Sequence, residues 1–136
     1  MISPDLNKDS IKIWNKLMKN VLVTGGAGFI GSNFIRCLLD SEPNVNIVNL
    51  DALTYAGSME NLRDLPYPDR HTFVHGDICD RTAVDSILEQ YAIDTIVHFS
   101  AESHVDRSIA GPGIFVQTNV VGTFTLLESA KTYTKQ

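Results

Sequence analysis

The sequence predicts an α/β fold in which helices cover both faces of a parallel sheet. Three observations predict it. Short apolar runs recur along the chain between turn residues, and stretches with helical periodicity separate them. The first apolar run, residues 21–24, ends in a glycine-rich turn that opens the first helix. Strands that alternate with helices in this way are joined by right-handed crossovers and run parallel.

Strands are expected at residues 21–24, 46–50, 72–76 and 94–99, each an apolar run bounded by turn residues. The helix after the glycine turn places apolar residues on one face, namely Ile30, Phe34, Cys37 and Leu38. Further helices are expected at residues 58–64, from the capping residue Asp80 through Tyr91, and from about Ile114 to Tyr133, the last preceded by a polar loop at residues 100–111.

Residues 1–17 differ from the rest and are expected to form an extension to a single domain at residues 18–136. Ile11, Trp14 and Leu17 lie at helical spacing. A short amphipathic helix and a frayed tail both remain open for this segment.

The composition narrows the class of protein. The chain of 136 residues is 43% hydrophobic with a net charge of −5 and has no basic run, so nucleic acid is not an expected partner. It has no apolar run of membrane-spanning length and no signal peptide, so a cytoplasmic protein is expected. Its two cysteines, Cys37 and Cys79, are expected to be buried free thiols, with Cys37 on the inner face of its helix.

Three glycines at a spacing of three dominate the first turn. Gly25 permits a tight turn off the strand, Gly28 lets a pyrophosphate approach the backbone, and Gly31 lets the helix pack closely. The free N–H groups of the first helical turn then face the anion. The spacing and its strand–helix context predict a dinucleotide site on a Rossmann-type sheet with strand order 3-2-1-4.

Asp51 ends the second expected strand, twenty positions after Gly31. A carboxylate at that place binds the hydroxyls of the adenosine ribose and repels a 2′-phosphate. No arginine follows closely to accept that phosphate, so NAD is expected rather than NADP. An aspartate that only ends a strand is the alternative.

Five stretches resemble motifs of the extended short-chain dehydrogenase/reductase family, and the last two are close to those of its nucleotide-sugar dehydratases that act on dTDP-glucose. They are TGGAGFIGS (24–32), DALTYAG (51–57), HGDICD (75–80), AESHVDRS (101–108) and TNVVGT (118–123). The resemblance runs from Lys19 to the end of the chain.

The resemblance implies a set of site residues. Those expected to bind NAD are Gly25, Gly28, Phe29, Ile30, Gly31, Asp51, Ala52, Leu53, Thr54, Asp77, Ile78, Phe99, Ser100, Ala101 and Thr118, and Ser103 is expected to contact the sugar substrate. Asp77 and Ile78 are placed at the adenine, although a turn aspartate is the plain alternative for the first. A helix-packing hydroxyl is the alternative for Thr118.

The resemblance also implies a reaction. NAD-dependent oxidation at C4 of dTDP-glucose, loss of water across C5 and C6, and return of the hydride give dTDP-4-dehydro-6-deoxy-glucose, a precursor of rhamnose and related sugars. The family's catalytic Tyr-x-x-x-Lys and Thr-Asp-Glu segments would follow the point where this chain stops, so it is expected to be a truncated cofactor-binding half, with no catalytic residue and inactive alone. Another nucleotide-sugar epimerase or dehydratase and a non-catalytic NAD-binding module are the alternatives.

Two other site types are not expected. Ser103, His104 and Asp106 are too close in sequence to converge as a hydrolase triad. His98, Glu102 and His104 lack the spacing of a metal site, so no metal is expected. The apolar residues of the last expected helix extend beyond one face, and the resemblance implies a homodimer formed through that helix.

Overall fold

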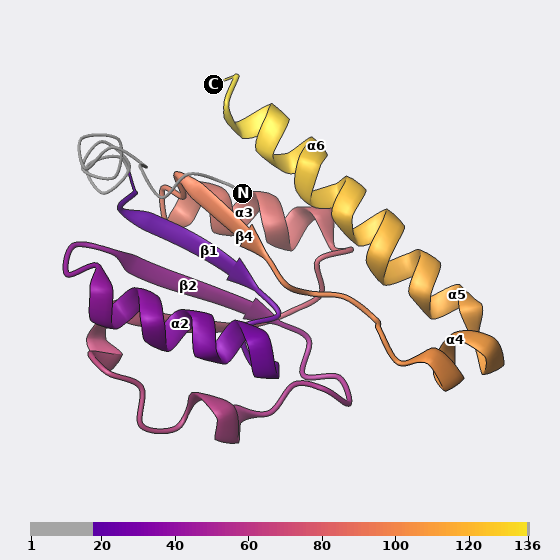
Figure 1. The fold of residues 1–136 in the computed structure, drawn as a ribbon. Coiled ribbons are helices and arrows are strands. Elements are labelled where there is room, and N and C mark those ends of the chain that lie inside the picture. Colours follow the sequence, from indigo (N-terminus) through magenta and orange to yellow (C-terminus); the bar gives the residue numbers. More distant parts are fainter. Residues whose placement is uncertain (1–17, 136) are drawn as a thin grey trace, which may run out of the picture.

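The computed structural model describes residues 18–135 and contains a four-stranded parallel sheet. The strands are β1 (Asn20–Thr24), β2 (Asn46–Asp51), β3 (His71–His75) and β4 (Thr95–His98), in the order β3-β2-β1-β4 (Figure 1). This order confirms the predicted Rossmann-type sheet. The expected extension, residues 1–17, lies outside the described residues.

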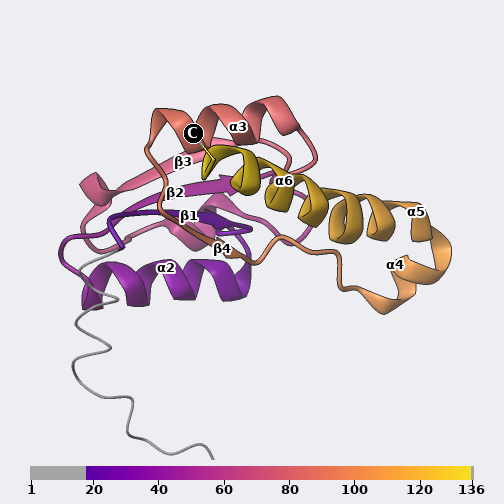
Figure 2. The ribbon, with the colours of Figure 1, turned by 90° about the horizontal axis from the view of Figure 1, so that it is seen from above.

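Helices cover both faces of the sheet, as predicted. Helix α2 (Phe29–Ser41) covers one face, and α3 (Arg81–Gln90) and α6 (Thr123–Tyr133) lie side by side on the other (Figure 2). Asp80 caps α3 as expected, because its carboxylate accepts a hydrogen bond from the backbone N–H of Ala83 at 3.0 Å.

The core consists of two apolar layers separated by the sheet. On β1, Val21 and Val23 pack toward α2, and Leu22 packs toward α3 and α6. Because both faces are covered, a central strand is apolar at successive positions instead of alternating with polar residues. This explains the continuous apolar run that leads into the glycine turn.

The inner face of α2 differs from the prediction. Its buried residues are Gly31, Ser32, Ile35, Leu38 and Leu39. Ile30 is 66% exposed and Cys37 is also exposed, so the expected inward position of both was wrong. At 3.6 residues per turn, Ile35 and Leu39 share one side of the helix, and Cys37, two residues after Ile35, lies on the opposite side, toward solvent. Cys37 and Cys79 are free cysteines, as expected, but neither is buried.

The segments between strands contain one short helix that was expected, at residues 58–64, and two that were not. Residues 58–64 contain a short 3-10 helix, η1 (Met59–Leu62), and a second, η2 (Pro68–Arg70), precedes β3. Helix α4 (Val105–Ala110) occupies part of the expected polar loop. The last helix begins earlier than expected, at Pro112.

That last helix is continuous but not uniformly α-helical. It consists of α5 (Pro112–Phe115), a π-helical segment η3 (Val116–Gly122) and α6. Figure 1 shows it crossing the outside of the sheet and extending with α4 beyond the ends of the strands. Its first sixteen residues, 112–127, carry no charged side chain.

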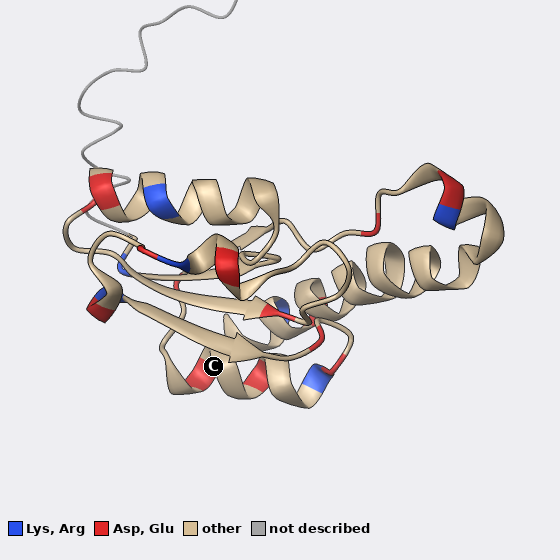
Figure 3. Cartoon of the chain, turned by 90° about the horizontal axis from the view of Figure 1, so that it is seen from below, with Lys and Arg blue, Asp and Glu red and all other residues tan. Residues whose placement is uncertain are grey.

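Acidic and basic residues are mixed along the described chain, and in the view of Figure 3 the Lys and Arg positions are spread over several elements. Within residues 18–135, no helix combines the length and the apolar character needed to cross a membrane.

Candidate dinucleotide site

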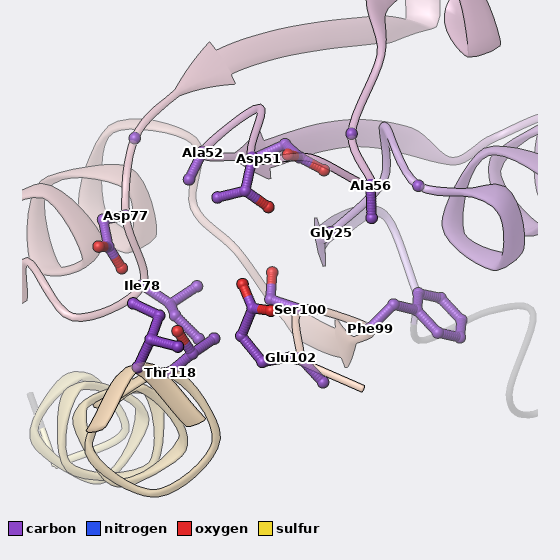
Figure 4. Close-up of a pocket in the computed structure, with 16 residues that line it drawn as sticks. Gly25, Asp51, Ala52, Ala56, Asp77, Ile78, Phe99, Ser100, Glu102 and Thr118 are labelled. Atoms are coloured by element: carbon purple, nitrogen blue, oxygen red, sulfur yellow. The ribbon is translucent and has the colours of Figure 1, made fainter. Parts of the chain in front are cut away.

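A cleft lies at the carboxyl ends of the strands, where ligands bind in open α/β sheets. It encloses about 690 Å³, part of which is open to solvent. Loops that follow all four strands line it, together with the first turns of the long last helix (Figure 4). Its lining residues are Gly25, Gly28, Asp51, Ala52, Thr54, Ala56, Gly57, Gly76, Asp77, Ile78, Phe99, Ser100, Ala101, Glu102, Ile114 and Thr118.

The glycine turn has the geometry that its sequence predicts. Gly25 has φ +70°, and a Cβ there would lie 2.6 Å from the backbone nitrogen of Ser100. A Cβ on Gly31 would collide with the carbonyl oxygen of Gly25. A Cβ on Gly28 would have only that carbonyl oxygen within 4 Å, at 3.3 Å, so Gly28 leaves space at the cleft.

The N-terminus of α2 is open to an anion. Its N-cap, Gly28, makes no side-chain capping hydrogen bond, and the first helical turn has no acidic side chain. The N–H groups of Phe29 and Ile30 fall in this first turn, where no carbonyl of the same helix is available to accept from them. The Phe29 side chain is 81% exposed and has no hydrogen-bond donor, so any hydrogen bond to an anion here would come from the backbone.

Asp51 is both a cleft residue and a support of the glycine turn. It is 7% exposed. One carboxylate oxygen, Oδ2, accepts from the N–H of Ala27, and the other, Oδ1, accepts from the N–H of Leu53, each at 2.8 Å. Leu53 has φ +50°, a conformation that the second hydrogen bond helps to stabilise. The carboxylate is thereby held beside the end of β1.

The two residues expected at an adenine both line the cleft. Ile78 is 3% exposed and also belongs to the core layer beneath α3. Asp77 is exposed, and its Oδ1 accepts from the N–H of Cys79 at 2.9 Å. This hydrogen bond fixes the turn after β3, so Asp77 also has the local role of an ordinary turn aspartate.

The loop after β4 is held by the last helix. The side chain of Asn119 accepts from the N–H of Glu102 and donates to its carbonyl oxygen, both at 2.8 Å. Asn119 lies in the π-helical segment η3, next to the cleft residue Thr118. Single π-helical turns are frequent at functional sites. Here the π-helical segment contributes Thr118 to the cleft lining, and its Asn119 holds the backbone of Glu102 on the opposite wall.

A histidine links β4 to both neighbouring elements. The His98 ring contacts the Thr24 hydroxyl through Nδ1 at 2.6 Å and the Thr123 hydroxyl through Nε2 at 3.1 Å. Partial burial lowers the pKa of His98. These contacts connect the end of β1, the edge strand β4 and the start of α6 directly behind the cleft.

Most of the predicted cofactor residues lie together in this cleft, but not all of them. Phe29, Ile30, Gly31 and Leu53 are outside its lining, although their backbones shape it as described above. Ser103, expected at the sugar, is exposed and also outside the lining. The lining residues that were not predicted are Ala56, Gly57, Gly76, Glu102 and Ile114. The first four fall inside or beside the recognised motifs, a signal that could have included them.

The charge of the cleft is unusual for a site near an anion. Asp51, Asp77 and Glu102 line it, and no Lys, Arg or His does so among the described residues. Carboxylates accept hydrogen bonds from hydroxyl and amino groups, and the open helix N-terminus favours a phosphate. The cleft therefore offers acceptors for the hydroxyl or amino groups of a ligand and a helix N-terminus for an anion. Within residues 18–135, no cluster of three His, Cys, Asp or Glu side chains is placed to hold a metal ion.

The chain resembles known nucleotide-sugar enzymes in sequence. It is 50% identical over 113 residues to dTDP-glucose 4,6-dehydratase of Salmonella typhimurium, covering 83% of this chain and 31% of the relative. It is 52% identical over 118 residues to that of Xanthomonas campestris, covering 87% and 33%. The chain thus spans about a third of the length of the curated relatives that it matches.

Solved structures show the same relationship. A dTDP-glucose 4,6-dehydratase of Streptomyces venezuelae, crystallised with NAD and TYD, superimposes with a TM-score of 0.75 at 53% identity, covering 82% of this chain and 35% of that one. A UDP-Glc/GlcNAc 4-epimerase of Campylobacter jejuni superimposes with a TM-score of 0.76 at 32% identity, covering 85% and 34%. A model of the GDP-mannose 4,6 dehydratase family matches residues 22–136. The match spans most of the sequence, confirms the resemblance to nucleotide-sugar dehydratases, and establishes that the chain belongs to the GDP-mannose 4,6-dehydratase family.

Proposed function

We propose that this chain binds NAD and forms the cofactor-binding part of a dTDP-glucose 4,6-dehydratase. The observation that carries the proposal is the cleft at the sheet edge. It combines the uncapped N-terminus of α2 with a glycine turn and with the carboxylate of Asp51. Relatives of about 50% identity named as dTDP-glucose 4,6-dehydratases, and an NAD-bound structure of such an enzyme, support it.

Each part of the cofactor has a proposed place. The pyrophosphate lies at Gly28 and accepts hydrogen bonds from the N–H groups of Phe29 and Ile30. The adenosine ribose donates to Asp51, whose oxygens retain lone pairs beside their backbone donors. The adenine lies against Ile78 and donates its amino group to Asp77. The negative charge of Asp51 disfavours the 2′-phosphate of NADP.

When bound, NAD would supply a hydride acceptor for the proposed reaction. This chain's residues bind the cofactor, orient it at the β4 side of the cleft, and offer Ser103 as a contact for the sugar. The overall change is a water elimination, so the complete enzyme would be a lyase. Within this sequence no Tyr-x-x-x-Lys occurs: the residues four places after Tyr55, Tyr67 and Tyr91 are Met59, His71 and Thr95, and only three residues follow Tyr133. We therefore propose that these 136 residues bind NAD without turning over dTDP-glucose.

A second candidate is a nucleotide-sugar 4-epimerase, because an epimerase superimposes with a TM-score of 0.76, compared with 0.75 for the dehydratase. The identity of 53% to the dehydratase, compared with 32% to the epimerase, favours the first reading. A comparison of the affinities for dTDP-glucose and for UDP-glucose discriminates between the two enzymes. Tighter binding of UDP-glucose would support the epimerase. A module that binds NAD without belonging to any enzyme remains the alternative from another class.

We further propose a homodimer formed through the last helix and a cytoplasmic location. Exposed apolar side chains on that helix support the dimer. The free thiols of Cys37 and Cys79 suit a reducing compartment.

Calorimetric titration of the purified chain with NAD tests the proposed function. Saturable binding of one NAD per chain is expected, with no appearance of the 4-keto sugar when dTDP-glucose is added. The absence of saturable binding would refute the assignment of the cleft. Turnover would mean that acid–base chemistry resides in residues to which we assign only binding.

A further inference from the structure

An aromatic ring and a guanidinium group meet at the rim of the cleft. The guanidinium carbon of Arg107, in α4, lies 3.9 Å from the centroid of the Tyr55 ring, which makes a cation–π contact. The ring of His104, the residue before α4, meets the same tyrosine edge to face, with 6.2 Å between the ring centroids and 84° between the ring planes. Tyr55 therefore connects the loop after β2 to the chain that follows β4.

This contact joins the two walls of the cleft. Strands β2 and β4 lie on opposite sides of β1 in the sheet, so the segments that follow them flank the glycine turn at the end of β1. In the loop after β2, Thr54 and Ala56 line the cleft, whereas Tyr55 between them does not. In the loop after β4, the lining ends at Glu102, two residues before His104. The contact thus lies just outside the lining, where the two walls meet.

The contact can open without disturbing the fold. Tyr55, His104 and Arg107 are exposed, and none of them belongs to either apolar core layer. The turn that carries Tyr55 is closed by a hydrogen bond from the N–H of Gly57 to the carbonyl oxygen of Thr54 at 3.0 Å, so the ring projects from a defined backbone. An exposed cation–π contact changes an equilibrium by about two- to fivefold, which favours a closed rim and still allows it to open.

We propose, on the basis of the NAD site proposed above, that Tyr55, His104 and Arg107 form a latch at the rim of the cleft, which a dinucleotide must open when it enters or leaves. A ligand that lies across the end of β1 passes between the two segments that this contact joins. The contact involves only groups of the protein, so the latch closes whether or not a ligand is bound. Such a latch slows association and dissociation by the same factor and leaves their ratio, the dissociation constant, unchanged.

Stopped-flow fluorescence with NADH measures both rate constants, the dissociation rate by displacement with excess NAD. In Tyr55→Leu and in Arg107→Leu, which remove the ring and the cation, we expect both rates to rise about two- to fivefold with an unchanged Kd. The double variant should be no faster than either single variant, because the two changes break one contact. Tyr55→Phe keeps the ring and should keep the wild-type rates.

A matched control is a cation–π pair outside the cleft lining, in which the guanidinium carbon of Arg70 lies 4.4 Å from the centroid of the Tyr67 ring. Tyr67→Leu should change neither rate.

Three results would overturn the latch in a chain that binds NADH. Unchanged rates in Tyr55→Leu and Arg107→Leu would show that the contact does not restrict the cleft. Faster dissociation without faster association would show that Tyr55 touches the ligand directly. Faster rates in Tyr55→Phe would assign the effect to the hydroxyl instead of the ring. If the wild-type chain binds neither NADH nor NAD, the proposed function itself fails, and the latch fails with it.

Discussion

The carboxylate of Asp51 accepts a hydrogen bond from the backbone N–H of Ala27 at 2.8 Å and so ties the end of β2 to the glycine turn. The residue predicted to hold a ribose is therefore also part of the scaffold that shapes the pyrophosphate site. Any test of its binding role must separate these two effects.

We predict that Asp51→Ala weakens NAD binding, reduces the preference for NAD over NADP, and lowers stability. The backbone donors on Ala27 and Leu53 lose their acceptor, which costs about 1–3 kcal/mol for a buried group. Titration of both cofactors and thermal melts measure the two effects separately. If the variant is less stable but the ratio of NAD to NADP affinity is unchanged, Asp51 is structural only.

Substitution of Gly28 should affect NAD binding, whereas substitution of Gly31 should affect stability. Gly28→Val is predicted to fold and to lose NAD binding, because its side chain would project where the pyrophosphate is expected. Gly31→Ala is predicted to lower the melting temperature by several degrees, because its Cβ would collide with the Gly25 carbonyl oxygen. Circular dichroism melts and NAD titration of both variants provide the measurement. Full NAD binding by folded Gly28→Val would exclude the pyrophosphate from this turn.

Stability should decrease at mildly acidic pH. The half-buried ring of His71 approaches the Asn49 amide at 3.4 Å, and burial lowers the pKa of His71 below its usual 6.5. The unfolded chain then takes up the proton first as the pH falls through 6.5, so folding stability is highest above that pH and declines below it.

Melting temperatures between pH 7.5 and 5.5 test this prediction. We expect a decline for the wild type and a shallower one for His71→Gln, which keeps a polar side chain but cannot titrate. His104→Gln, at an exposed position, should retain the wild-type slope. Equal slopes for all three proteins would show that His71 does not contribute.

The long last helix is predicted to mediate self-association. Its side chains Val116, Val120, Phe124 and Leu127 are 56–65% exposed and lie at helical spacing. An apolar surface of this kind, on a helix whose residues 112–127 carry no charge, favours contact with a second copy. Sedimentation should show a dimer that Phe124→Asp shifts toward monomer. A wild-type chain that sediments as a monomer at high concentration would contradict the prediction.

The sequence predicted those features that depend on local pattern. The strands, the glycine turn and the cap at Asp80 follow from spacing and residue type within a few positions. Cys37 was misplaced because α2 offers two neighbouring apolar stripes, and the one that packs on the sheet contains Ile35 and Leu39 instead of Cys37. The short helix expected at residues 58–64 was confirmed as the 3-10 helix at Met59–Leu62, whereas helix α4 is too short for periodicity to resolve.

Site residues were predicted where a sequence motif determines the local backbone geometry. They were missed where a contact between residues distant in sequence places a residue in the cleft. Glu102 lies inside a recognised motif, but no local pattern reveals that Asn119, seventeen positions later, holds its loop in place. Ile114 lines the cleft because the last helix begins at Pro112, earlier than its apolar stripe suggested. Ser103 was placed by resemblance alone, and whether it contacts a sugar remains a prediction.

The most direct test of the central claim is to map the response of backbone amides to NAD by heteronuclear NMR, which suits a chain of 15.0 kDa. We predict that the largest shifts occur at Gly28, Phe29, Ile30, Leu53 and Ile78, which surround the cleft at the carboxyl ends of the strands. Largest shifts in the hollow formed near Arg70 and Tyr91, at the opposite ends of the strands, would contradict the account.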